Sequence, residues 1–385
     1  MAVESDAIVR IDQVSGRSQL TDFIRVPWNV YSDDARWVPP LMLERQLHLS
    51  KRNPYFAHAE AAYWVAYRGG RPVGRISAQV NRLHLEQHQD ATGHFGFLEA
   101  IDDPAVFRGL FDAAEAWLRA RGMKRVIGPF TLSINDECGL LIEGYDTPPM
   151  FLMAHGRPYY NDRIFELGYA RAKDTVAYML DASKPQSEVI GSTVRRLSDR
   201  IKIRPVSLAN LKDDIETLRD IFNDAWLNNW GYIPFTAAEF EDFGTSMRHF
   251  VPPEFIQIVE VDGEPAAMMV VIPNLNEVLG DLDGRLLPLG WAKLLWRLKR
   301  DKPRSARVPL MGIRRKHQRS SLGILLVFLM VDAVWQPMLD YGIERVELSW
   351  VLEDNYPMRH IQERIGAYAY KTYRLYDKSL NGHAG

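Results

Sequence analysis

The chain has a single cysteine and almost no excess of either charge, and both features narrow its possible functions. Cys138 is the only cysteine among 385 residues, which excludes an intrachain disulfide and a cysteine-based zinc site and fits a reducing compartment. The 47 lysines and arginines against 49 aspartates and glutamates give a net charge of −2, without the basic footprint of a nucleic-acid-binding protein. We expect no nucleic-acid partner and no bound metal.

Long apolar segments are also missing. The first residues, Met1 to Asp6, contain an acidic pair and no apolar core of a signal peptide. The longest uninterrupted apolar run, Leu322 to Val331, is shorter than the ~20 residues that cross a bilayer. We therefore expect a cytoplasmic protein, soluble or peripheral at the inner face of the cell membrane.

Parts of the sequence repeat, which predicts two similar units in tandem. Residues 122–127 recur as 342–347, and residues 164–175 resemble 361–372. The length also exceeds the ~250–300 residues of a usual single core. We expect the units to span 1–185 and 186–385, with a helix at 190–197 soon after the boundary.

The first unit carries clear strand and helix signals. Residues 62–67 and 73–80 flank Gly69-Gly70, which predicts a hairpin, and residues 93–99 predict a further strand. A helix is expected over 105–121. The connection before it, residues 100–104, is acidic and lacks glycine, so it would repel a diphosphate.

Residues 308–326 are the most informative part of the chain. An apolar strand is followed by a basic loop and then by small residues that open an apolar helix. Backbone N–H groups in such a loop, together with the positive end of the helix dipole, bind anions. The loop has neither the Walker sequence nor GxGxxG. A plain strand-to-helix turn with a solvated basic loop remains the alternative.

This loop resembles the acyl-CoA pyrophosphate loop of the GCN5-related N-acetyltransferase (GNAT) superfamily, Q/R-x-x-G-x-G/A. Gln318, Ser321 and Gly323 occupy its three defined positions, with serine replacing the first glycine. Further on, the spacing from Asn355 resembles the closing pattern NxxAxxxYxxxGF, but Gln362 stands where the usual tyrosine acid would be. The resemblance implies a mixed α/β fold of two GNAT-like units, each a central twisted mixed sheet flanked by helices.

The resemblance also implies a cofactor site in the C-terminal unit. Two adjacent parallel strands, the second at 343–352, would part so that the pantetheine arm of acyl-CoA pairs with an exposed edge. The implied acyl-CoA contacts are Ile313, Arg314, Arg315, Gln318, Arg319, Ser320, Ser321, Leu322, Gly323 and Asn355.

Catalysis in this superfamily is a direct attack of an amine on the acyl thioester, so it needs a base and an acid. Glu353 is the favoured base, since it ends the strand beside the expected parting; Tyr356 is the candidate acid. The other carboxylates considered are Glu260, Glu347 and Asp354. In an insertion at 131–160 of the first unit, Glu137 and His155 are a second candidate pair. A solvated or structural role remains the alternative for each of these residues, and a structural role is the commoner one for a histidine such as His155.

Residues 286–300 suggest a helix that lies in a membrane interface. Trp291, Leu294, Leu295 and Leu298 share one face at helical spacing, while Lys293, Arg297 and Arg300 lie on another. An amphipathic helix packed on the sheet would show the same pattern.

Over nearly its whole length the chain resembles a two-unit bacterial GNAT-like family that includes relatives of the bacterial ceramide synthases. The resemblance is carried by motifs beginning at Trp37, Asn53, Gly74, Ser133 and Leu348. It implies an acyl-CoA-dependent N-acyltransferase acting on a lipid amine such as a sphingoid base. Two alternatives remain: an acetyltransferase for a small polar amine or a protein lysine, and a non-catalytic acyl-CoA-binding or lipid-binding protein.

Overall fold

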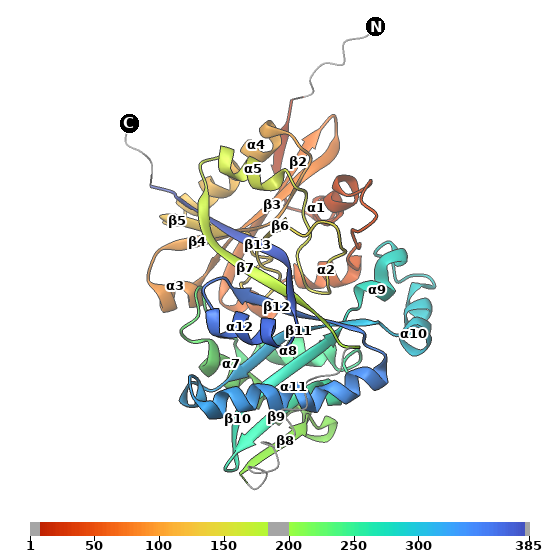
Figure 1. Cartoon of the computed structure of the whole chain (residues 1–385). Coiled ribbons are helices and arrows are strands. Elements are labelled where there is room, and N and C mark those ends of the chain that lie inside the picture. Colours follow the sequence, from red (N-terminus) through yellow and green to blue (C-terminus); the bar gives the residue numbers. More distant parts are fainter. Residues whose placement is uncertain (1–7, 184–199, 382–385) are drawn as a thin grey trace. The chain divides into compact units, whose positions relative to one another are not determined.

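The computed structural model describes residues 8–183 and 200–381 (Figure 1). They form two compact units, and each unit combines segments that are distant in sequence. Unit 1 takes Met1–Thr175, Leu279–Leu287 and Lys371–Gly385, and unit 2 takes Val176–Val278 and Pro288–Tyr370. The expected boundary near 185 and the expected helix at 190–197 lie outside the described residues. The chain is therefore not divided at one point.

Unit 1 is built on a mixed sheet with the order β1-β2-β3-β4-β5-β13, and β6 pairs with β13. The pairs from β1 to β4 are antiparallel and β4–β5 is parallel. The expected hairpin is confirmed as β2 and β3, joined by Gly69 and Gly70 at positive φ. The strands are β1 (Arg10–Gln13), β2 (Ala59–Arg68), β3 (Arg71–Asn81), β4 (Thr92–Ala100), β5 (Arg125–Gly128), β6 (Leu140–Glu143) and β13 (Tyr368–Ser379).

Helices pack against this sheet and complete the core of unit 1. The predicted helix over 105–121 is α4 (Pro104–Arg119), whose apolar stripe packs on β1, β2 and β3. The other long helix, α1 (Arg17–Val30), contacts β2, β3 and β4. Three short helices, α2 (Met42–His48), α3 (Arg82–His88) and α5 (Tyr160–Glu166), lie between strands in sequence.

The strands of unit 2 follow the order β7-β12-β11-β10-β9-β8. The central pair, β11 and β12, is parallel, and β8 to β11 are antiparallel. The strands are β7 (Ala170–Asp181), β8 (Ile201–Pro205), β9 (Ile256–Val261), β10 (Glu264–Pro273), β11 (Ser305–Ile313) and β12 (Arg345–Leu352).

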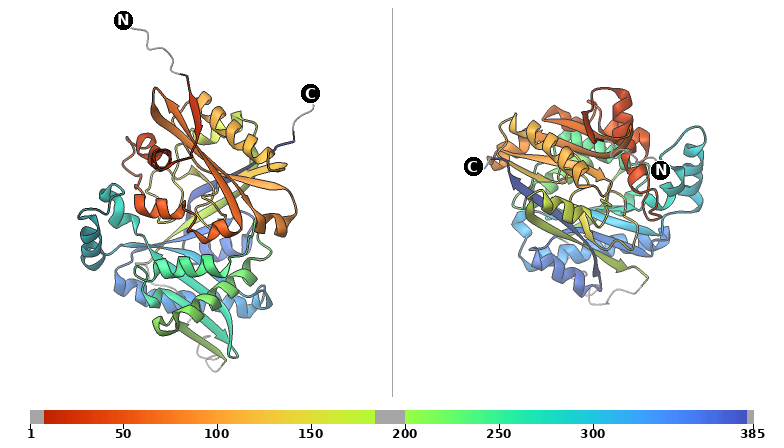
Figure 2. Two further views of the ribbon diagram at one scale, coloured as in Figure 1. Left: turned by 180° about the vertical axis from the view of Figure 1, so that it is seen from behind. Right: turned by 90° about the horizontal axis from the view of Figure 1, so that it is seen from above.

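The helices of unit 2 cover both faces of its sheet. Helix α11 (Ser321–Tyr341) crosses in front of β9 and β10 in Figure 1. From behind, α7 (Leu211–Trp226) and α8 (Ala237–Met247) lie in front of the strands instead (Figure 2). The unit also contains α9 (Asn276–Leu279), α10 (Gly290–Arg300) and α12 (Tyr356–Arg364). The expected mixed α/β architecture is confirmed.

The sequence repeats correspond to repeated structure. In each unit a glycine with positive φ lies between a helix and the strand that follows: Gly122 between α4 and β5 in one unit, and Gly342 between α11 and β12 in the other. Gly168 after α5 and Gly366 after α12 repeat the arrangement before β7 and β13. The final strand differs from the expected plan, since β13 from Lys371 onward belongs to unit 1 and β7 from Val176 onward belongs to unit 2.

Helix α11 is longer than the apolar run that predicted it. It continues through Asp332 to Tyr341, and its 21 residues, with a mean hydropathy of 1.9 in the most apolar window, are long and apolar enough to cross a membrane. The apolar run from Leu322 to Val331 is therefore only part of this helix, since neither Asp332 nor Asp340 interrupts it. In unit 2 the helix packs on β8, β9 and β10. A core helix of a soluble protein has the same length and composition.

Candidate active site

The two parallel strands of unit 2 part midway along their length. Their ladder runs from Ser305–Arg345 to Val308–Leu348, although β11 continues to Ile313 and β12 to Leu352. Beside this point, Val308 and Pro309 stand opposite one residue of β10, which is a bulge. Pro309 has no N–H group for a ladder. The predicted parting is confirmed, and we call this point the fork.

A tight turn links the end of β11 to α11. The side-chain amide of Gln318 donates to the carbonyl of Ile313 at 2.8 Å and to that of Ala225 at 3.1 Å. Ser320 caps the helix by accepting from the N–H of Gly323 at 3.0 Å. A Cβ at Gly323 would lie 2.4 Å from the carbonyl oxygen of His317, so only glycine fits. The backbone here is bent as a phosphate-binding turn requires.

The basic side chains of this loop are less mobile than the sequence suggests. Arg314 and Arg315 form ion pairs with Asp220 and Asp224 of α7, and Lys316 pairs with Glu264 of β10. Arg319 is exposed at φ 58°, and the described part of the chain gives it no ion pair. The paired cations fix the loop on the sheet, while Arg319 keeps its charge available for an anion.

A buried carboxylate lies at the fork. Glu347, on β12, is 0% exposed and accepts hydrogen bonds from the hydroxyls of Ser349 and Tyr370. Arg307, its ladder neighbour on β11, places Nε 3.5 Å from Glu347 Oε1 and donates to Ser349 Oγ at 2.8 Å. Burial of a carboxylate requires such partners. The position of Glu347 at the fork makes it the best-placed base of unit 2.

The other candidates of unit 2 lie in different environments. Glu353 is half-buried just beyond the end of β12, and Tyr356 is 71% exposed at the start of α12. Asn355 caps α12, as predicted, by accepting from the N–H of Met358 at 3.3 Å. Gln362 is only 5% exposed, and its Oε1 has no hydrogen-bond partner among the described residues. A buried amide oxygen of this kind suits a ligand N–H group.

In unit 1 the predicted Glu137 and His155 each have another partner. Glu137 accepts from Arg45 at 2.9 Å, and His155 Nε2 lies 2.9 Å from Asp34 Oδ2. Burial lowers the pKa of His155, which favours its neutral form. Both residues have structural partners in unit 1, and their catalytic roles stay predictions.

Sequence reasoning missed a largely enclosed carboxylate, Glu99 of unit 1, whose side chain is 14% exposed. Its Oε2 accepts from the hydroxyls of Tyr31 at 2.5 Å and Tyr160 at 2.7 Å, and Arg75 lies 3.9 Å from Oε1. Burial raises the pKa of Glu99 to about 7. No local motif marks this residue, because its partners are separated from it by 24 to 68 positions.

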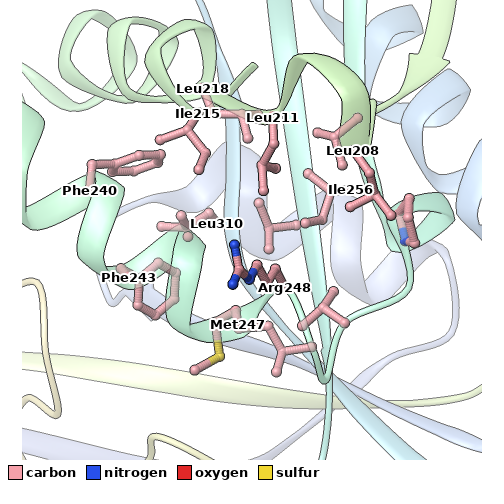
Figure 3. A pocket seen from close by; sticks show the side chains of 16 residues that line it. Leu208, Leu211, Ile215, Leu218, Phe240, Phe243, Met247, Arg248, Ile256 and Leu310 are labelled. Carbon is pink, nitrogen blue, oxygen red and sulfur yellow. The ribbon is translucent and has the colours of Figure 1, made fainter. Parts of the chain in front are cut away.

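An apolar pocket lies in unit 2 between the sheet and the helices α7 and α8 (Figure 3). Side chains of α7 and α8 point into it from one side and those of β9 to β11 from the other. The lining residues are Val206, Leu208, Leu211, Ile215, Leu218, Phe240, Phe243, Gly244, Met247, Arg248, Val251, Pro253, Ile256, Val270, Ile272 and Leu310.

No family model matches the chain, but two curated proteins resemble it over nearly its full length. It is 45% identical over 379 residues to "Bacterial ceramide synthase" of Caulobacter vibrioides (strain NA1000 / CB15N), which covers 98% of this chain and 99% of the relative. It is 44% identical over 365 residues to "Protein YghO" of Escherichia coli (strain K12), covering 94% of each chain.

Solved structures resemble the fold. A tandem GNAT protein from the clavulanic acid biosynthesis pathway matches with a TM-score of 0.58 at 13% identity, over 97% of this chain and 99% of that one. A GCN5-related N-acetyltransferase from Sphaerobacter thermophilus matches with a TM-score of 0.53 at 12% identity, over 97% and 96%. These likenesses confirm the tandem GNAT fold.

Proposed function

The chain belongs to the family of the bacterial ceramide synthase and YghO, and from this premise we propose that it is an acyl-CoA-dependent N-acyltransferase for the amine of a sphingoid base. The relative's name supports the acceptor, and the tandem GNAT fold supports the acyl donor. The observation that carries the proposal is the fork of β11 and β12, with the buried carboxylate of Glu347 beside it.

The residues around the fork fit acyl-CoA. The edge of β11 beyond Val308 is no longer paired with β12, so the amides of a pantetheine arm can add to it as a strand would. The turn at Gly323 and the N-terminus of α11 suit the diphosphate, with Arg319 supplying charge. Gln362 Oε1 can accept from an amide of the arm.

The chemistry needs one proton acceptor at the fork. As the amine nitrogen bonds to the thioester carbon, its proton passes to Glu347, the C–S bond breaks, and the leaving thiolate takes up the proton. Tyr370 and Ser349 hold the carboxylate in place through their hydroxyls. We favour Glu347 over Glu353 because it is buried at the parting itself, where exclusion of water strengthens its electrostatic interactions.

A lipid acceptor requires access to a membrane, and α10 supports that part of the proposal. Trp291, Leu295 and Trp296 are each about half exposed, whereas Leu294 is buried and anchors the helix. The exposed cations Lys299 and Arg300 follow on the same helix. Tryptophan beside exposed cations is typical of helices that lie at an anionic lipid surface. We propose that the protein works as a peripheral enzyme at the inner face of the cell membrane.

Mass spectrometry of the reaction products tests the function. Purified protein is incubated with palmitoyl-CoA or acetyl-CoA and with a sphingoid base, a polyamine or a lysine peptide. We expect an N-acylated sphingoid base from palmitoyl-CoA. Acylation of the polar amines alone would instead establish the acetyltransferase alternative. Binding of acyl-CoA without turnover of any amine would favour the non-catalytic alternative.

A further inference from the structure

We propose that the apolar pocket of unit 2 binds the alkyl chain of the acyl-CoA thioester. The inference rests on the proposed N-acyltransferase function and assigns the chain-binding part of that site. The pocket lies between the strands of unit 2 and the helices α7 and α8, and its lining is almost entirely apolar.

The chemistry of the lining selects an aliphatic ligand. Among the sixteen lining residues only Arg248 carries a charge, and it is exposed; the remaining side chains offer no hydrogen-bond donor or acceptor. A polar ligand would lose its bonds to water there without replacement. An unbranched hydrocarbon chain loses nothing and gains contacts with leucine, isoleucine and phenylalanine side chains.

The pocket lies close to the fork along β11, which indicates that its ligand is the alkyl chain of the acyl-CoA bound at the fork. Leu310 lines the pocket and lies on β11 two residues beyond Val308, the last residue paired with β12. Ile272 also lines the pocket, and its ladder partner is Arg307. Because paired residues share a face of a sheet, Arg307 and its own partner Glu347 emerge on the pocket's face. A chain attached to a thioester at the fork can therefore follow this face into the pocket.

The pocket is partly open to solvent, so only part of its space is enclosed by side chains. Protein interiors are close-packed, and empty volume forfeits dispersion contacts. Here three large side chains of α8, Phe240, Phe243 and Met247, line the space instead of closing it. Apolar cavities that stay dry bind apolar ligands.

A chain-length series tests the pocket directly. Acyl-CoAs from acetyl to stearoyl are titrated calorimetrically into the full chain, below their micellar concentrations and without acceptor. Affinity should rise by roughly fourfold per methylene until the pocket is full, and then level off. A series that stays flat from acetyl to stearoyl would overturn the proposal.

Two variants should move this series in opposite directions. Leu211→Trp, which adds volume to the lining, should remove the gain for long chains and leave CoA and acetyl-CoA binding unchanged. Phe243→Ala, which removes volume, should shift the plateau to longer chains. Leu339→Trp on α11 is the matched control: it lies outside the pocket lining, is 37% exposed and should change nothing. Thermal melting establishes that each variant is folded.

The possible outcomes distinguish an error in the pocket assignment from an error in the proposed N-acyltransferase function. If wild-type protein binds neither CoA nor any acyl-CoA, the proposed function fails and the inference fails with it. If acetyl-CoA binds but Leu211→Trp and Phe243→Ala both leave the series unchanged, the pocket assignment alone is wrong. If Leu211→Trp instead raises only the KM of the sphingoid base, the pocket binds the base's alkyl chain and the donor assignment is overturned.

Discussion

Both units contain a parallel strand pair that parts. Among the described residues, a segment of the chain itself bonds to the freed strand edge in unit 1, whereas β11 of unit 2 keeps this edge for a ligand. In unit 1 the ladder of β4 and β5 ends at His94 and Ile127, and β4 continues to Ala100. There the N–H of Phe130 donates to the carbonyl of Phe95 at 2.8 Å, and a Cβ at Gly96 would lie 1.6 Å from Phe130 O. The chain itself thus occupies the strand edge in unit 1.

The helices that follow the two forks differ in the same way. Asp103 caps α4 by accepting from the N–H of Ala105 at 2.9 Å, so a carboxylate already lies at the positive end of this helix. At α11 the neutral Ser320 forms the cap, and Arg319 stands before it. In unit 1 the N–H of Phe130 and the carboxylate of Asp103 therefore take the two positions that, in unit 2, we assign to the pantetheine amides and the diphosphate of the ligand. A repeated fold does not imply a repeated site.

The sharpest test of this comparison replaces one carboxylate near the parting strands of each unit by glutamine. Glu347→Gln should lower kcat by about 10²–10⁴-fold while CoA affinity is retained, because a general base contributes that much. Glu99→Gln, on β4 beyond the parting of the strand pair in unit 1, should leave kcat within a few-fold of wild type. Steady-state kinetics and calorimetry measure both quantities.

Two further variants serve as controls for the catalytic assignment. Glu353→Gln and Tyr356→Phe should each change kcat only slightly, since one residue lies past the end of the strand and the other is largely exposed. If Glu353→Gln lost most of its turnover while Glu347→Gln kept normal turnover, Glu353 would be the base, as the sequence analysis favoured.

The anion-binding turn can be compared with its counterpart in the same manner. Gly323→Glu places a side chain against His317 O and a negative charge at the diphosphate, so CoA affinity should fall by about 100-fold or more. Ala105→Glu, exposed in the first turn of α4, adds the same charge to unit 1 and should leave CoA binding unchanged. Equal affinities in two folded variants would reject the assignment of the turn.

Glu99 gives a pH-dependent test of unit 1. Its folded pKa, about 7, is raised above the usual value of 4.5, so its protonated form favours folding and this contribution is lost as pH rises from 4.5 to 7. Glu99→Gln imitates the protonated form. The free energy of unfolding of this variant, relative to wild type, should rise by about 3 kcal/mol across that range. A difference that does not vary with pH would show that Glu99 titrates normally.

The smallest expected effect concerns α10. Wild-type protein should sediment with anionic liposomes, and salt should weaken binding because each lysine or arginine near the surface contributes about 1 kcal/mol. Trp291→Ser with Leu295→Ser should reduce sedimentation without loss of the fold. Leu43→Ser with Leu47→Ser, two exposed leucines of α2 in unit 1, is the matched control. Failure of wild-type protein to bind liposomes would contradict the membrane contact.

Much of the fold followed from local patterns. Gly69-Gly70 predicted the hairpin, the recurring Gly122 and Gly342 predicted the repeated units, and Asn355 predicted a helix cap. These features depend on backbone conformation within a few residues, which sequence expresses directly.

The site was only partly predictable, because its pairs are distant in sequence. Glu347 was one of several carboxylates until Tyr370 and Arg307, 23 and 40 positions away, were seen to surround it. Likewise, the partner of His155 is Asp34, 121 positions away, and not Glu137. The pocket between α7, α8 and the strands is lined from four separate stretches of chain, and no periodicity reveals how they come together.

The placement of β13 constrains how the protein can form during synthesis. Tyr376 and Ser379 pair with β5, Arg374 pairs with β6, and Lys371 donates to the carbonyls of Gly144 and Thr147. Domains usually fold in order as they leave the ribosome. Unit 1 begins first but receives this strand last, so its sheet stays incomplete until nearly the whole chain has been translated. A nascent chain must therefore keep the open edges of β5 and β6 from pairing with other chains throughout the synthesis of unit 2.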